Sequence, residues 1–177
     1  MGVEASSSIE EIRNTLRDAN FTKEDYLKIY SRFNSLDKDF SGTIDEGEFR
    51  KIKSLSENPI LDRIIYATDK DNDGEINFFE FISGYSLFVG DSKTLEKTKF
   101  LFKVLDIDND GFLSFDDLFQ VSKLLLFSKF NDNQLRDLVK EIIGKYDFDM
   151  DEKLSYLEFT QTVCKFMNND LMKITIE

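Results

Sequence analysis

The chain contains the sequence Asp69-Lys70-Asp71-Asn72-Asp73-Gly74-Glu75-Ile76-Asn77-Phe78-Phe79-Glu80, with oxygen-bearing side chains at alternate positions and a glycine at the sixth. This arrangement satisfies the twelve-residue calcium-loop pattern D-x-[DN]-x-[DN]-G-x5-E at every restricted position. A hard cation such as Ca2+ takes about six to eight oxygen ligands. The glycine permits a left-handed turn that costs an ordinary residue about 1–2 kcal/mol. We therefore predict a calcium site in this segment.

The same spacing recurs three more times along the chain. In this pattern, positions 1, 3, 5 and 12 offer side-chain oxygens, position 7 offers its backbone carbonyl, and position 9 acts through a water. The predicted ligands are Asp37, Asp39, Ser41, Thr43, Asp45 and Glu48 in the first loop (37–48); Asp69, Asp71, Asp73, Glu75, Asn77 and Glu80 in the second (69–80); Asp106, Asp108, Asp110, Phe112, Ser114 and Asp117 in the third (106–117); and Asp147, Asp149, Asp151, Lys153, Ser155 and Glu158 in the fourth (147–158). The recurrence favours up to four Ca2+ sites over solvated acidic loops.

Three loops depart from the pattern. Ser41 brings an uncharged oxygen to the first loop, which therefore carries less negative charge than the second. Asp117 replaces the usual glutamate of the third loop, and its shorter side chain makes a bidentate reach harder and suits Mg2+ better. Glu152 stands at the glycine position of the fourth loop, where left-handed geometry costs about 1–3 kcal/mol. We expect the first two loops to match Ca2+ best and the other two to be weaker or less selective.

Apolar residues occupy position 8 of every loop, namely Ile44, Ile76, Leu113 and Leu154. Such residues suit a short antiparallel strand pair between two loops, which predicts that the first loop pairs with the second and the third with the fourth. The predicted fold is all-α, with four helix–loop–helix calcium hands (EF-hands) in two paired lobes. The predicted organisation is an N-terminal segment with a short helix (1–20), an N-terminal lobe (21–89), a linker (90–92), a C-terminal lobe (93–168) and a tail (169–177).

Local patterns also predict where several helices begin and end. Thr22 and Asn131 each open a capping-box pattern, and Asn58-Pro59 is typical of a helix start with proline at the first helical position. The helix that leaves the first loop is predicted to continue through Phe49, Ile52 and Leu55, because these apolar residues recur at helical spacing.

The composition excludes several classes of function. The formal net charge is −12, which argues against nucleic acid as a partner because phosphates require Lys and Arg. The chain has no histidine, which excludes Ser–His and Cys–His catalytic pairs and the usual His-ligated zinc sites. Cys164 is the only cysteine, and its apolar neighbours favour a core residue over a nucleophile. No apolar run is long enough to span a membrane. We predict a cytoplasmic protein with a regulatory role that is not an enzyme, and N-myristoylation would allow it to associate with a membrane.

The first residues, Met1-Gly2-Val3-Glu4-Ala5-Ser6, match the N-myristoylation pattern M-G-x-x-x-[ST], with Gly2 as the acylated residue. The motif is short and is equally compatible with a disordered start. One myristoyl chain gives only marginal membrane binding, and no polybasic patch accompanies it. We therefore expect at most a weak membrane contact through this segment.

The segment after the third loop is unusually apolar. It contains Leu118, Phe119, Val121, Leu124, Leu125, Leu126 and Phe127. Core packing accounts for about half of these side chains, and the others exceed what a single helical stripe can bury, which indicates a surface for a partner. Phe and Leu dominate over Met, which favours one helical partner over many targets.

With these features the chain resembles calcineurin B, the regulatory subunit of the calcium- and calmodulin-dependent protein phosphatase. The resemblance covers nearly the whole chain and rests on the N-terminal motif, the loop spacing, Glu57-Asn58-Pro59, Leu118-Phe119-Gln120-Val121 and the tail near Ile174-Thr175-Ile176. It implies a constitutive partner, an amphipathic helix of the phosphatase catalytic subunit, to which the chain would confer calcium sensitivity. It also implies docking of substrates or inhibitors at the matching residues Leu125, Leu126, Lys129 and Phe130.

Two features depart from that family. Its C-terminal sites are usually the tight ones, whereas here Asp117 and Glu152 weaken the motif in those loops. Ser122 stands where the family tends to be apolar, which bears on the docking contact. Two other functions remain open: a calcineurin-B-homologous protein that regulates a membrane ion exchanger, and a simple cytosolic calcium buffer. A buffer needs no partner groove, so the apolar segment after the third loop counts against it.

Overall fold

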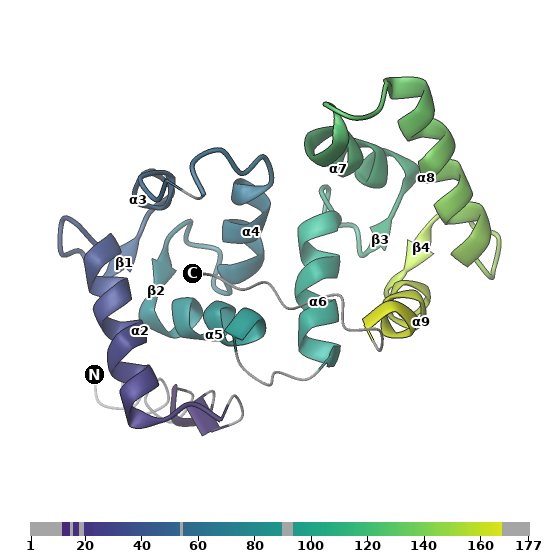
Figure 1. Ribbon diagram of the computed structural model, residues 1–177. Helices are drawn as coiled ribbons and strands as arrows, with labels where there is room; N and C mark the ends of the chain where they lie inside the picture. Colours follow the sequence, from purple (N-terminus) through teal and green to yellow (C-terminus); the bar gives the residue numbers. More distant parts are fainter. Residues whose placement is uncertain (1–11, 15, 18–19, 54, 90–93, 168–177) are drawn as a thin grey trace. The chain divides into compact units, whose positions relative to one another are not determined.

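The computed structural model describes residues 12–14, 16–17, 20–53, 55–89 and 94–167, and the chain divides into two compact units. The first unit contains α2 (Lys23–Leu36), β1 (Thr43–Ile44), α3 (Glu46–Arg50), most of α4 (Leu61–Thr68), β2 (Ile76–Asn77) and α5 (Phe78–Val89) (Figure 1). The second unit contains α6 (Thr94–Leu105), β3 (Phe112–Leu113), α7 (Phe115–Leu126), α8 (Asp132–Tyr146), β4 (Leu154–Ser155) and α9 (Tyr156–Met167). The predicted linker, the lipidation site Gly2 and the tail lie outside the described residues.

Capping boxes begin helices at the positions that the sequence predicts. The Thr22 side chain accepts a hydrogen bond from the amide of Asp25, and the Asp25 side chain accepts one from the amide of Thr22, so α2 begins at Lys23. Asn131 and Gln134 form the same reciprocal pair at the start of α8. Each box satisfies two backbone donors that a helix N-terminus would otherwise leave unpaired.

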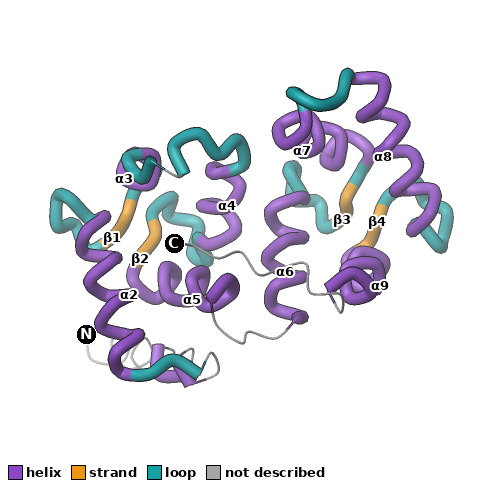
Figure 2. Tube along the Cα trace, viewed as in Figure 1, coloured by secondary structure: helices purple, strands orange, loops and turns teal. Residues whose placement is uncertain are grey.

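One short antiparallel strand pair joins the two loops of each unit, as Figure 2 shows in orange. β1 pairs with β2 so that Ile44 lies opposite Ile76, and β3 pairs with β4 so that Leu113 lies opposite Leu154. These four position-8 side chains are 0%, 0%, 0% and 3% exposed, respectively. The all-α fold and the pairing of first with second and third with fourth loops are therefore confirmed.

Each unit has a core of its own around its strand pair. In the first unit, Ile44 and Ile76 pack with the buried residues Phe33, Leu36, Leu61 and Ile65. In the second unit, Leu113 and Leu154 pack with Phe102 and Phe159. Since the strand residues come from the loops and the rest from the flanking helices, any shift of a loop acts directly on helix packing.

Two predicted helix ends in the first unit are wrong. α3 ends at Arg50 instead of continuing to Leu55. The amides of Lys51 and Ile52 donate to carbonyls three residues back, at 3.2 and 3.0 Å, which is the hydrogen-bond pattern of a 3₁₀ turn and not of an α-helix. α4 begins at Leu61 rather than at Pro59. There the Asn58 side chain accepts a hydrogen bond from the amide of Ile60 (3.0 Å) and forms a turn that delays the helix.

Among the described residues, none of the helices combines the length and the apolar character that crossing a membrane requires.

The position-8 residues should dominate the stability of each unit. Replacing Ile44 with alanine is expected to lower the free energy of unfolding by about 2–5 kcal/mol, because it opens a cavity beneath the strand pair. Urea denaturation with a calcium chelator present measures this. The control is Leu27→Ala on α2, where the side chain is 54% exposed and the change should stay within about 0.5 kcal/mol. Equal losses in both variants would contradict the assignment of the core.

Candidate metal sites

Each loop closes around its first aspartate through a bond from the backbone. The amide at position 6 donates to the Oδ2 oxygen of the aspartate at position 1. The N···O distances are 3.0 Å for Gly42 and Asp37, 3.0 Å for Gly74 and Asp69, 3.1 Å for Gly111 and Asp106, and 2.9 Å for Glu152 and Asp147. This bond fixes the side chain that the sequence predicts as the first ligand.

The acidic side chain at position 12 accepts hydrogen bonds at both of its oxygens. In the three glutamate loops, Oε1 lies 2.6 Å from the amide of Lys38, 2.6 Å from that of Lys70 and 2.7 Å from that of Phe148. The second oxygen accepts from the amide at position 9. Glu48, Glu80 and Glu158 are all buried. Both oxygens are thus held at the loop, as a bidentate ligand requires.

The side chains at position 9 also begin the helix that leaves each loop. They accept hydrogen bonds from the amide at position 12, at 2.7 Å for Asp45, 3.0 Å for Asn77, 3.2 Å for Ser114 and 3.4 Å for Ser155. The sequence analysis missed this capping role. The signal was present, because positions 9 and 12 have the spacing of a capping box.

The remaining side chains of each loop order the backbone. The aspartate at position 3 accepts from the amide at position 5, at 3.0 Å for Asp39, 3.3 Å for Asp71, 3.1 Å for Asp108 and 3.3 Å for Asp149. The side chain at position 5 bonds to the backbone of position 7. In the first loop the Ser41 hydroxyl donates to the carbonyl of Thr43 at 3.1 Å. In the other loops the aspartate accepts from the amide at position 7, at 2.9 Å for Asp73, 2.8 Å for Asp110 and 3.0 Å for Asp151. The position-7 carbonyls stay predicted ligands.

Three carboxylates gather in every loop with oxygens within 4.8 Å of one another. The groups are Asp37, Asp39 and Glu48; Asp69, Asp71 and Asp73; Asp106, Asp108 and Asp117; and Asp147, Asp149 and Glu158. Removal from water raises the pKa of Asp106, and the neighbouring carboxylate of Asp117 adds to the effect. Desolvation likewise raises the pKa of Asp149, with a further contribution from Asp151. A divalent cation would relieve this repulsion between like charges.

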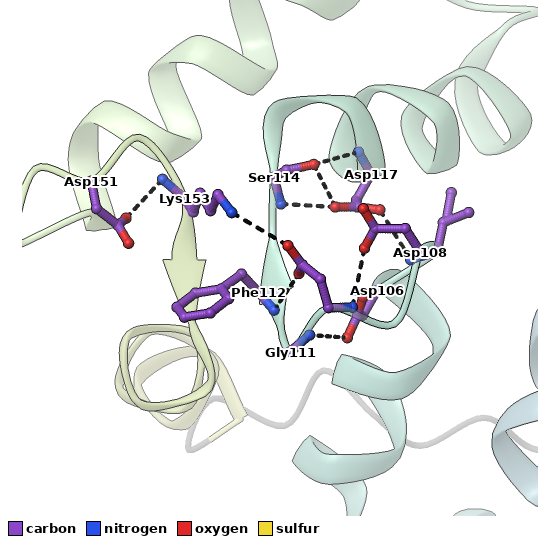
Figure 3. A network of polar contacts seen from close by, with 10 residues as sticks. Asp106, Asp108, Gly111, Phe112, Ser114, Asp117, Asp151 and Lys153 are labelled. Atoms are coloured by element: carbon purple, nitrogen blue, oxygen red, sulfur yellow. Dashed lines mark hydrogen bonds and ion pairs between the residues drawn. The ribbon is translucent and has the colours of Figure 1, made fainter.

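The third loop gives the most direct evidence that its oxygen ligands suit a cation; Figure 3 draws its polar contacts. Asp106 is buried, and its Oδ2 accepts from the amide of Gly111. Its Oδ1 has no hydrogen-bond partner among the described residues. An unpaired buried carboxylate oxygen is costly, and a hard cation coordinated there would satisfy it. The residues present therefore fit Ca2+ or Mg2+.

Asp117 occupies the position-12 role despite its shorter side chain. It is buried, and its two oxygens accept from the amides of Ile107 (3.0 Å) and Ser114 (2.9 Å), the same partners that the glutamates take in the other loops. These bonds connect the N-terminal turn of α7 to the third loop.

Left-handed backbone geometry occurs at two positions of the fourth loop. Glu152 has a φ of +67°, so the conformation predicted for a side chain at the glycine position is confirmed. Position 4 is left-handed as well, with φ values of +62° at Phe40, +59° at Asn72, +59° at Asn109 and +63° at Met150. The sequence analysis missed this. Asparagine, which tolerates this region well, was the available signal in the second and third loops.

Exposed apolar side chains follow the third loop, as the sequence predicts. Leu124, Leu125 and Phe127 are 40%, 47% and 71% exposed, whereas Val121 is buried. Of the four predicted docking residues, Leu125, Lys129 and Phe130 are exposed and Leu126 is half-buried. Docking at these residues stays a prediction.

Comparison with known proteins agrees with this geometry. The model of the EF-hand domain pair matches residues 26–86 and 95–164. The chain is therefore an EF-hand protein, a class that implies Ca2+ binding, and its carboxylate groups are compatible with it. It is 40% identical over 163 residues to the calcineurin B subunit of Candida glabrata, covering 92% of this chain and 91% of that protein. The chain belongs to the calcineurin B family.

Other relatives carry the same name. The calcineurin B subunit of Naegleria gruberi is 40% identical over 164 residues, which cover 92% of this chain and 93% of that protein. The type 2 calcineurin B subunit of Mus musculus is 37% identical over 163 residues, which cover 92% of this chain and 88% of that protein. The similarity thus spans both EF-hand pairs.

Removing the side chain at position 6 of the fourth loop should strengthen that site. Glu152→Gly is expected to raise its Ca2+ affinity about tenfold over Glu152→Ala, because glycine adopts the left-handed geometry about 1–2 kcal/mol more readily. The alanine variant is the matched control, since both changes remove the same charge. The NMR signal of the amide at residue 152 follows the titration. Equal affinities in the two variants would show that backbone strain does not limit this loop.

Lengthening the position-12 side chain of the third loop should change its ion preference. Asp117→Glu is expected to raise the ratio of Ca2+ to Mg2+ affinity by about tenfold, because a bidentate glutamate completes the larger calcium shell. Competition calorimetry measures the ratio. The reciprocal variant, Glu48→Asp in the first loop, should lower it. A ratio that does not respond in either variant would separate ion preference from the length of this side chain.

Proposed function

We propose that this chain is a calcium-responsive regulatory subunit that binds an amphipathic helix of a Ser/Thr phosphatase catalytic subunit of the calcineurin A type. The names of its relatives support the phosphatase, and the four carboxylate groups support the calcium. The role is non-catalytic: the chain contributes a metal-dependent surface and no reacting group. Acylation of Gly2 would add a marginal membrane contact.

The observation that carries this proposal is that α7 connects the third loop with exposed apolar side chains. Asp117 lies in the first turn of the helix, and Leu124 and Leu125 lie in its last turn. A twelve-residue helix moves as a stiff body, so a cation that draws in the Asp117 carboxylate also moves the apolar end. This connection supports a coupling between the third loop and the surface where a partner would bind.

The chemistry of that surface favours an apolar helical partner. Removing a leucine from water contributes about 1.5–3 kcal/mol, so a partner that covers Leu124, Leu125 and Phe127 gains a substantial part of its binding free energy there. An amphipathic helix presents apolar residues at positions i, i+3, i+4 and i+7, which suits a helix-lined surface. A plain calcium buffer has no use for exposed apolar side chains at this place.

Co-purification tests this role. The tagged full chain, expressed in its native cell, should recover a phosphatase catalytic chain that mass spectrometry identifies. Leu125→Glu is expected to weaken binding about tenfold or more, because it places a charge in an apolar contact. The control is Gln161→Glu on α9, which adds the same charge at an exposed polar position of the same unit.

Three results would count against the proposal. Recovery of a membrane exchanger without any phosphatase would favour the calcineurin-B-homologous role. Recovery of no partner, together with a hydrophobic dye that does not bind with or without calcium, would favour a buffer. Equal binding by both variants would remove α7 from the interface.

A further inference from the structure

A lysine of the fourth loop reaches a predicted metal ligand of the third loop. The Lys153 ammonium lies 3.3 Å from Oδ2 of Asp110, the residue at position 5. The two residues are 43 apart in the sequence. Their side chains are 41% and 37% exposed, so the pair lies at the rim of the loop and not in the core.

Neighbouring contacts hold the lysine in place. Its ammonium also lies 5.1 Å from the centre of the Phe112 ring, and its backbone amide donates to Asp151 at 3.0 Å. The pairing of β3 with β4 sets Phe112 opposite Ser155, two residues beyond Lys153. The lysine stem is therefore positioned by the strand register, the ring and the loop, and its charge points back to the third loop.

The corresponding contact in the first unit carries no positive charge. There the Thr43 hydroxyl donates to the carboxylate of Glu75, so position 7 of one loop contacts position 7 of the other. In the second unit, position 7 of the fourth loop instead brings an ammonium to a ligand of its partner loop. Position 7 of the later loop in each pair therefore carries a negative charge in the first unit, at Glu75, and a positive charge in the second unit, at Lys153.

We propose that Lys153 is an internal counter-ion of the third loop, which competes with the divalent cation for Asp110 and lowers the Ca2+ affinity of that loop. This inference rests on the proposed calcium role and adds a regulator to it. Without a cation, the ammonium offsets part of the repulsion among Asp106, Asp108 and Asp110. With a cation, the ammonium draws on the same carboxylate charge and lies near a like charge. Solvent screens the exposed pair, so its effect on affinity is about two- to fivefold.

Titration of the full 15N-labelled chain with Ca2+ tests this. The amide of Gly111 donates to Asp106 and reports the third loop, while those of Gly42 and Gly74 report the first two loops and serve as internal standards. In Lys153→Met, which keeps an apolar stem over Phe112, the midpoint at Gly111 should fall about two- to fivefold, and the gain should shrink as salt is added. Lys153→Arg should stay close to the parent.

The matched control is Lys123→Met. Lys123 pairs with Asp132 at 2.9 Å in the same unit, and Asp132 is not a predicted ligand, so the change in net charge is the same without the contact. Its Gly111 midpoint should equal that of the parent. An unchanged or higher midpoint in Lys153→Met, or an equal fall in Lys123→Met, overturns the role of Lys153 and leaves calcium binding intact. A Gly111 signal in the parent that ignores millimolar Ca2+ overturns calcium binding by this loop as well.

Discussion

Crowding of carboxylates is the constraint to which the rest of the molecule responds. Every loop holds three acidic oxygens within 4.8 Å of one another, and such groups repel when all are charged. Backbone amides stabilise these carboxylates. In the first loop, the amides at positions 2 and 9 donate to the carboxylate at position 12, and the amide at position 6 donates to the carboxylate at position 1. The chain is left-handed at positions 4 and 6 of every loop. The loop conformation and the hydrogen bonds at the start of the exit helix therefore both stabilise the crowded carboxylates. A divalent cation would neutralise the repulsion that remains between them.

The same loops also supply the centre of each core. A pair of two-residue strands is too short to be stable alone, so it depends on the side chains packed beneath it. Ile44 and Ile76 are fully buried, and they come from different loops of the first unit. A change in one loop must therefore be accommodated by its partner and by the helices around both. The paired unit, and not the single loop, is therefore the element that packs as one core.

Features with a local or periodic cause could be predicted from the sequence. The ligand spacing and the helix starts at Thr22 and Asn131 follow from residues that are close in the chain, and the strand pairing follows from the apolar residue that recurs at position 8 of each loop. The end of α3 could not be predicted, because 3₁₀ turns are frequent at helix ends and the apolar spacing of Phe49, Ile52 and Leu55 does not show where the bonding pattern changes. The left-handed turn at position 4 was obscured by Phe40, which disfavours it. The contact of Lys153 with Asp110 depends on side-chain conformations across two strands, which no sequence pattern encodes.

The two units differ in how far each loop departs from the best calcium chemistry. The second loop has a full set of acidic ligands and a glycine, whereas the fourth has a strained Glu152 and the third has the short Asp117 with a lysine beside it. α7, which bears the exposed apolar surface, leaves one of these compromised loops. A tight site there would stay filled at resting calcium and could signal nothing. Under the proposed function, weak Ca2+ binding by the third and fourth loops would leave α7 able to respond when calcium rises, which a sensor requires and a buffer does not.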